Sequence, residues 1–192
     1  MTVSHLTPAT YRTSRWSGGE TTELAIWPRG AVYGRRDFLF RVSSATVELE
    51  ESTFTALPDY ERRIATLEGS IRLIHDGGRP LVLAPFQVHA FDGGSETVSF
   101  GRCRDFNLML RKGRAAGSLT ALTSGETPLP MPLKADWALL YCAEGRCTVT
   151  VDDVAYGLSS GESLFLEAPI ASTLTLQGEA RLMLAQITEE EG

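Results

Sequence analysis

The chain has 192 residues, of which 43% are hydrophobic and 22% charged, a composition typical of a globular protein. A formal net charge of −6 without any run of Lys or Arg argues against a nucleic-acid binder and a polybasic membrane anchor. No apolar stretch approaches the roughly 18 residues of a spanning helix, and the first residues lack the features of a secretion signal. We therefore expect a cytoplasmic protein without nucleic-acid or membrane partners.

Short β-strands are predicted along most of the chain. Apolar residues recur mostly at every second position or in short runs, and Gly, Asp and Pro separate them. In the first half, strands are expected at 38–43, 46–50, 63–67, 71–75, 81–83 and 106–110. In the second half they are expected at 137–143, 147–151, 154–158, 163–166, 172–176 and 181–187. This pattern predicts an all-β protein.

The segment 112–134 is rich in small residues and Pro, which indicates a connection rather than a strand. We therefore expect a first barrel at 1–113, a linker or crossover at 114–134 and a second barrel at 135–192. In each half, an apolar strand is followed by a Glu-Gly pair, which ends at Gly69 in the first half and at Gly145 in the second. This repetition suggests an internal duplication. Closed barrels would also remove exposed strand edges.

The three cysteines, Cys103, Cys142 and Cys147, do not form a disulfide framework of the secreted type. If Glu144 and Gly145 form a two-residue hairpin turn, Cys142 lies opposite Cys147. A disulfide or redox switch is then one interpretation, and a reduced, buried pair is the other. Buried cysteines usually behave as small apolar side chains, which favours the second.

The Glu-Gly turns and a later Gly-x-x-x-Phe-Leu segment at 161–166 resemble the cupin superfamily, which implies double-stranded β-helix barrels. Metal-binding cupins carry a His-x-His pair, a Glu and a later His, ligands suited to transition metals. Cupin spacing places Arg62 at the Glu position and Thr55 and Leu57 near the His positions, whereas Ala138 takes the Glu position in the second half. We therefore expect neither a metal nor another cofactor.

Three segments, 16–23, 54–69 and 104–109, together resemble the HutD/Ves family of bicupins. The resemblance extends to about Gly113 and implies two cupin-like jelly-roll barrels. It also implies an association with histidine utilisation or stress response. An acidic histidine-breakdown intermediate such as formylglutamate is the ligand that the family suggests.

Arg41 and Arg62 are the predicted anion-binding residues, because a guanidinium offers paired planar donors to a carboxylate. A structural ion pair of Arg62 with Glu61 or Asp105 is an equal alternative. Asp105 and Asn107 alternate along a strand and so share a face, where they would bind a polar ligand. The slightly favoured alternative is that they satisfy backbone groups of a loop.

Trp16 and Gly19 belong to a loop in which Gly allows close backbone approach and the indole would cover a ligand. Packing of Trp16 across the barrel mouth is the alternative. Thr22 and Glu23 adjoin this loop, and strand alternation allows only one of them to face inward. His89 lies near the last cupin ligand position, as a hydrogen-bonded wall residue or as a general acid–base.

No complete catalytic set is recognisable, so no catalytic residue is assigned and a non-catalytic protein is favoured over an enzyme. The first hypothesis is a metal-free protein that binds and senses a small acidic metabolite. The second is an enzyme of the first barrel, either a metal-free cupin-type isomerase or lyase or one that uses His89 as general acid–base. The third is a protein-interaction scaffold, with a homodimer as one form of it.

Overall fold

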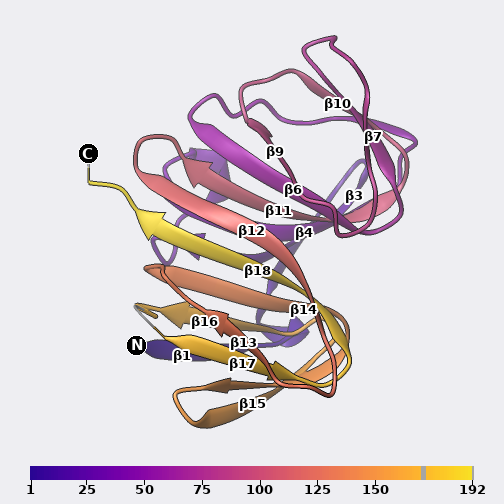
Figure 1. Ribbon diagram of the computed structural model, residues 1–192. Coiled ribbons are helices and arrows are strands. Elements are labelled where there is room, and N and C mark those ends of the chain that lie inside the picture. Colours follow the sequence, from indigo (N-terminus) through magenta and orange to yellow (C-terminus); the bar gives the residue numbers. More distant parts are fainter. Residues whose placement is uncertain (170–171, 192) are drawn as a thin grey trace. The chain divides into compact units, whose positions relative to one another are not determined.

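The computed structural model describes residues 1–169 and 172–191, and it is all-β (Figure 1). The described residues contain no α-helix and two short 3₁₀ turns, η1 (Pro8–Thr10) and η2 (Tyr33–Arg35). None of the described helices is long and apolar enough to cross a membrane. Contacts divide the chain into one unit of residues 12–116 and 191–192 and another of residues 1–11 and 117–190.

The unit of residues 12–116 holds two antiparallel sheets. The six-stranded sheet runs in the order β2 (Arg12–Trp16), β3 (Gly19–Trp27), β4 (Phe40–Val47), β11 (Cys103–Arg111), β6 (Tyr60–Glu68) and β9 (His89–Asp92). The four-stranded sheet runs in the order β5 (Glu51–Thr53), β10 (Thr97–Phe100), β7 (Ile71–His75) and β8 (Leu81–Leu83).

Buried apolar residues of this unit form two clusters, and the first joins both sheets. Val47 of β4 and Ile64 of β6 pack with Leu73 of β7 and Leu83 of β8. A second cluster includes Phe38 and Tyr60, whose rings stack with centroids 4.3 Å apart. The inward side chains alternate with outward ones along each strand, as in two sheets that pack face to face.

The other unit is built around β14 (Trp137–Val151), which pairs with β15 (Val154–Ser159), β16 (Ser163–Glu167), β17 (Thr173–Gln177) and β18 (Ala180–Glu189). Further strands are β1 (Thr2–Leu6), which pairs with β16, β13 (Leu129–Pro132), which pairs with β17, and β12 (Ala115–Ser124), which pairs with β18. Its core contains the fully buried Leu140, Leu164 and Leu182.

The organisation differs from the sequence prediction in two places. Residues 1–11 group with the C-terminal half, because β1 pairs with β16 along its whole length. The segment 114–134, expected to be a linker, contains β12 and β13. Pro130 and Pro132 lie in β13, whose single partner strand leaves room for residues that cannot donate a hydrogen bond.

The prediction of a hairpin turn at Glu144 and Gly145 was wrong. β14 continues through both residues, and the register with β18 shifts between Cys142 and Glu144, as at a β-bulge. Gly145 has a φ of +77°, and a Cβ there would lie 2.1 Å from the carbonyl oxygen of Glu179. Glycine is therefore required by the bend rather than by a turn. Cys142 and Cys147 are both buried and free, as in the reduced-pair interpretation.

Candidate functional site

A pocket of about 370 Å³ opens in the unit of residues 12–116. Its walls come from β2, β3, β4, β11 and β6 of the six-stranded sheet, from β5 with the loop that follows it, and from η2. The lining residues are Ser14, Trp16, Thr21, Tyr33, Arg41, Ser43, Ala45, Val47, Ser52, Thr53, Phe54, Thr55, Arg62, Asp105, Asn107 and Met109. The volume lies within the range of small-molecule sites, and the wall combines apolar side chains with a few polar ones.

Strand register brings the polar residues of the wall together. On β4 and β11, Asp105 faces Ala45, Asn107 faces Ser43 and Met109 faces Arg41. Arg62 of β6 lies on the other side of Met109. Because alternate residues share a face, this register places both arginines, Asp105 and Asn107 on the inner face of one sheet. Five of the eight predicted site residues, Trp16, Arg41, Arg62, Asp105 and Asn107, line the pocket.

The charge of Arg41 is already neutralised within the protein. Its Nε donates to Glu23 Oε2 at 2.8 Å, and its Nη1 donates to Ser43 Oγ at 3.1 Å. The guanidinium carbon also lies 4.5 Å from the centre of the Tyr33 ring. Both members of the ion pair are largely buried, with side-chain exposures of 8% for Arg41 and 15% for Glu23. Arg41 is therefore held by a structural ion pair at the pocket wall.

Arg62 has no such partner, although it is buried. Its Nη2 donates to Asn107 Oδ1 at 3.0 Å, while its Nε finds no hydrogen-bond partner among the described residues. The guanidinium carbon lies 4.8 Å from the centre of the Phe54 ring and 5.2 Å from that of Phe91. Burial lowers the pKa of Arg62, but a guanidinium remains charged at any relevant pH. Arg62 thus brings a positive charge and an unused donor to the pocket.

Asn107 links Arg62 to Asp105 through hydrogen bonds. Asn107 Nδ2 donates to Asp105 Oδ1 at 2.7 Å, and the backbone N–H of Ala45 donates to the same oxygen at 3.1 Å. Asp105 therefore satisfies a backbone group of β4, rather than of the Trp16 loop, and lines the pocket as well. Burial raises the pKa of Asp105 to about 6, although these hydrogen bonds, Arg62 and Arg41 act in the opposite direction.

The raised pKa of Asp105 predicts a stability that increases on acidification. The folded state binds the proton more tightly than the unfolded state, so stability from this group is present below about pH 4 and is lost as the pH rises through about 6. The full effect is about 3 kcal/mol. Asp105→Asn should remove this dependence, so the difference in unfolding free energy between variant and wild type should change between pH 4 and 7. Urea unfolding of both proteins at several pH values measures it.

The histidines also contribute to the pH dependence of stability, but wild type and variant contain the same histidines, so this contribution cancels in the comparison. A difference in unfolding free energy that stays constant from pH 4 to 7 would show that Asp105 titrates normally in the folded protein.

The three remaining predicted residues do not line the pocket. Gly19 has a φ of +147°, and a Cβ there would lie 1.9 Å from the carbonyl oxygen of Thr46, so its role is in the backbone. Thr22 bonds Thr13 Oγ1 through its own hydroxyl at 3.2 Å in an exposed position, while its neighbour Thr21 lines the pocket. Strand alternation thus brings Thr21 and Glu23 inward and leaves Thr22 outside.

His89 pairs with a second histidine instead of the pocket arginines. Its Nε2 lies 3.0 Å from Nε2 of His75, and both rings lie against the ring of Phe91. Burial lowers the pKa of both histidines, and His75 lowers that of His89 further. A His89 side chain that faced the same cavity as Arg62 would have favoured the enzyme hypothesis, but His89 is not among the residues that line the pocket.

Several pocket residues were missed by the sequence prediction. Tyr33 and Phe54 supply aromatic surface from segments between strands, where no periodicity marks an inward position. Glu23 was considered only as an alternative to Thr22, yet it is the partner of Arg41. Ser43 and Met109 could have been found by alternation, because they lie two residues from Arg41 and Asn107 on the same strands.

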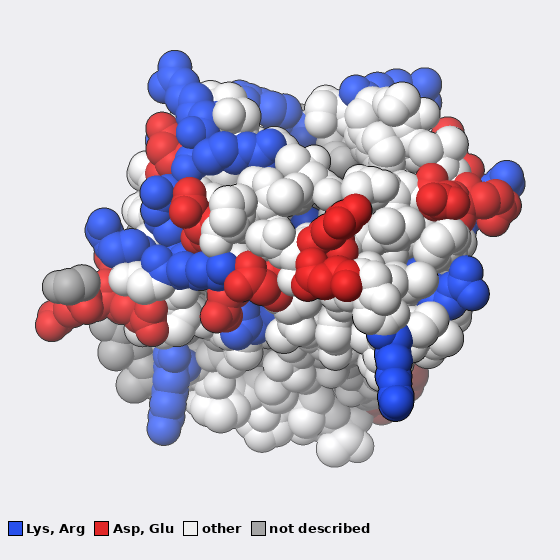
Figure 2. Space-filling view, turned by 90° about the horizontal axis from the view of Figure 1, so that it is seen from above, with Lys and Arg blue, Asp and Glu red and all other residues white. Residues whose placement is uncertain are grey.

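The face of the protein shown in Figure 2 carries charges of both signs. Lys and Arg side chains lie there among Asp and Glu side chains. No group of three or more His, Cys, Asp or Glu side chains suited to hold a metal occurs within residues 1–169 and 172–191. Of the positions that cupin spacing assigns to metal ligands, Thr55 and Arg62 line the pocket and Leu57 is buried in the core. Positive charge in the pocket wall comes from Arg41 and Arg62.

Comparisons with known proteins place these features in a family. The family model described as HutD matches residues 8–184. No curated protein sequence matches the chain. Among solved structures, PA5104 from Pseudomonas aeruginosa PAO1, a conserved protein of unknown function, is 25% identical with a TM-score of 0.87, over 98% of this chain and 100% of that one.

Two further structures show the same fold. HutD from Pseudomonas fluorescens SBW25, in a formate condition, is 24% identical with a TM-score of 0.82, over 99% of this chain and 100% of that chain. Ylba from E. coli is 13% identical with a TM-score of 0.73, over 99% of this chain and 92% of that chain. With the match over residues 8–184, these findings show that the chain belongs to the HutD family and has an all-β, cupin-like fold.

Proposed function

We propose that this protein binds a small carboxylic acid in the pocket of the unit of residues 12–116, without a metal and without catalysing a reaction. The observation that carries the proposal is the buried guanidinium of Arg62, whose Nε has no partner among the described residues. The carboxyl of Asp105 acts on this charge through Asn107 rather than by direct contact. A buried charge without a carboxylate in direct contact costs stability, so such a group is expected where a ligand supplies the opposite charge. A carboxylate matches the planar donors of a guanidinium.

Apolar and aromatic surface surrounds this charge and suits the carbon skeleton of a small metabolite. Phe54 and Met109 lie on the wall beside Arg62, and Trp16, 42% exposed, lies at the rim. Low local dielectric strengthens the attraction between a carboxylate and Arg62. A bound acid would lie beside Asn107, whose amide oxygen orients the guanidinium.

Membership of the HutD family suggests which acid to test first. We propose a histidine-breakdown intermediate, with formylglutamate as the first candidate, and a role in sensing that metabolite or limiting its overflow. A role in stress response would use the same binding step. We also infer that each unit forms one cupin-type barrel, which the two opposed sheets around the pocket and the repeated Glu-Gly segments support.

No observation favours an enzyme, because the histidine proposed as its acid–base group is not part of the pocket wall. A scaffold function is less favoured as well, since an open pocket with a buried cation is not needed for it.

The test is calorimetric titration of the metal-stripped protein with formylglutamate, glutamate and related acids, each beside its uncharged amide. We expect at least one acid to bind and its amide to bind far more weakly. In Arg62→Met the affinity for that acid should fall by about 100-fold, because a charged hydrogen-bonding partner is lost. At 100 times its dissociation constant, the acid should stabilise the wild type by about 2.7 kcal/mol.

The matched control is Arg72→Met, which removes an exposed arginine of β7 that lies over the Phe100 ring outside the pocket. This variant should bind the acid like the wild type. If both variants lost affinity equally, the effect would come from the overall charge of the protein, and the proposal would be wrong. Equal binding of acids and their amides would also contradict it.

A further inference from the structure

The contact between His75 and His89 joins the two sheets of the unit of residues 12–116. His75 is the last residue of β7 in the four-stranded sheet, and His89 is the first residue of β9 in the six-stranded sheet. Their Nε2 atoms point toward each other at 3.0 Å, and the ring centroids lie 5.1 Å apart. Both ends of the contact are thus fixed by strands, which hold side chains more rigidly than loops do.

Hydrogen bonding of the His75 ring is compatible with a lone pair on its Nε2. Nδ1 of His75 lies 2.8 Å from Thr97 Oγ1, and that hydroxyl donates to the carbonyl oxygen of Ser95 at 3.3 Å. In the tautomer that the metal site requires, the hydroxyl donates to Ser95 and Nδ1 of His75 donates to the hydroxyl oxygen. An imidazole whose outer nitrogen donates to an oxygen is the usual arrangement of a metal-ligating histidine.

The surroundings leave both imidazoles able to act as ligands. Each side chain is half-buried, so an ion and its water molecules can approach. Phe91 packs against both rings and shields them on one side. Burial lowers the pKa of His75. The carboxylate of Asp76 raises this pKa and the guanidinium of Arg62 lowers it, so the two charges have opposite effects.

The distance between the two nitrogens fits a shared metal ion. First-row metals bind imidazole nitrogen at about 2.0–2.1 Å, so an ion bound to two cis nitrogens holds them about 3 Å apart. We propose that His75 and His89 form a binding site for a divalent transition-metal ion that prefers imidazole, such as Zn²⁺, Ni²⁺ or Cu²⁺. Water completes the coordination, because the described residues offer two protein ligands and no third.

This site differs from the one that the cupin pattern would form. His89 lies near the last cupin ligand position, but the other positions are Thr55, Leu57 and Arg62, and His75 is not among them. In the absence of an ion, the same two nitrogens share one proton in an N–H···N hydrogen bond. Metal binding also needs the lone pair of His89 Nε2, so the proton on this nitrogen moves to Nδ1 of the same ring or is released to water. The ion then lies to one side of the line between the two nitrogens, and the strands do not need to move.

The test uses the full chain without an affinity tag. Titration with Zn²⁺ should give one bound ion per chain, and the electron paramagnetic resonance spectrum with Cu²⁺ should show coupling to two imidazole nitrogens. His75→Gln and His89→Gln should each weaken binding at least tenfold. His5→Gln is the matched control, because His5 is the remaining histidine and lies 3.4 Å from Glu162 in the other unit. It should bind like the wild type.

The outcome is separate from that of the carboxylate proposal. Arg62→Met should lose the acid and keep the metal, or bind the metal more tightly, because a nearby cation is removed. Absence of Zn²⁺ binding at sub-millimolar concentration would overturn the metal site. So would a spectrum without nitrogen coupling, or unchanged affinity in both His75→Gln and His89→Gln. The wild-type spectrum decides the question even if a variant fails to fold.

Discussion

Glu23→Gln is expected to lower the free energy of unfolding by about 3–5 kcal/mol, because it leaves the buried guanidinium of Arg41 without its carboxylate. Ser43 Oγ and the Tyr33 ring remain as contacts of Arg41, but neither carries an opposite charge. Adding Arg41→Met should recover most of the loss, since the unpaired charge is then gone. Urea unfolding of the two single variants and the double variant gives the coupling energy.

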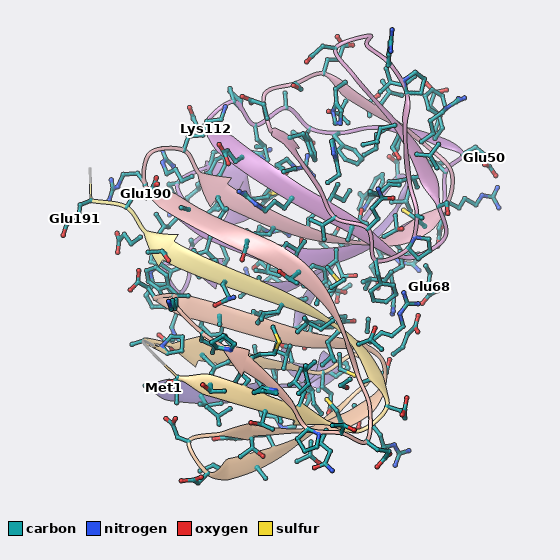
Figure 3. All side chains as sticks on the ribbon, viewed as in Figure 1. Met1, Glu50, Glu68, Lys112, Glu190 and Glu191 are labelled. Atoms are coloured by element: carbon teal, nitrogen blue, oxygen red, sulfur yellow. The ribbon has the colours of Figure 1, made fainter. Side chains whose placement is uncertain are left out.

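An exposed ion pair serves as the control for Glu23→Gln. Arg102 Nε lies 3.0 Å from Glu50 Oε1, and Glu50 is 75% exposed and projects at the edge of the protein (Figure 3). Glu50→Gln should change stability by less than about 1 kcal/mol. If Glu23→Gln also changed the free energy of unfolding by less than about 1 kcal/mol, the ion pair of Arg41 would contribute little to stability. Arg41 would then be a second cation available to the ligand.

Arg62→Met is expected to have the opposite effect on stability. Replacing a buried charge that lacks a carboxylate with an apolar side chain of similar length should raise the free energy of unfolding by about 1–3 kcal/mol. The same variant should lose the bound acid. A gain of stability with a loss of binding is typical of a residue kept for function. Thermal unfolding of the ligand-free proteins measures the first effect.

Arg62→Lys separates charge from shape at this position. It keeps a buried cation, so the gain in stability should be absent, while the single ammonium should bind the acid less well than the guanidinium fork. Should Arg62→Met destabilise the protein as strongly as Glu23→Gln does, Arg62 would have a structural role and the ligand proposal would lose its main support.

The all-β fold could be predicted from the sequence, and so could those strands in which apolar periodicity is clear. The strands at 71–75 and 81–83 were predicted with the bounds that the structure shows. β2 and β3 were missed because their residues are mostly polar and none of β2 is buried. An edge hairpin of this kind has no apolar alternation to reveal it.

The candidate site was predictable in its chemistry and less so in its pairing. Arg41 and Arg62 were chosen by residue type, and the structure distinguishes them through the single ion pair with Glu23. That pair arises because Glu23 of β3 lies opposite Ser43, two residues from Arg41 on β4, and the pairing of these strands cannot be read from the periodicity of either one. The contact of His75 with His89 could not be predicted from the sequence, because it spans two sheets.

The position of β1 affects how the protein folds as it is synthesised. This strand leaves the ribosome before residues 12–116, whereas its partner β16 leaves after them. Residues 12–116 can therefore complete their own sheets earlier, while the first strand waits with unpaired backbone groups. Such distant pairing makes folding slow and exposes an edge to aggregation in the meantime. For the same reason, a fragment that begins at residue 117 would leave one edge of β16 without its partner strand.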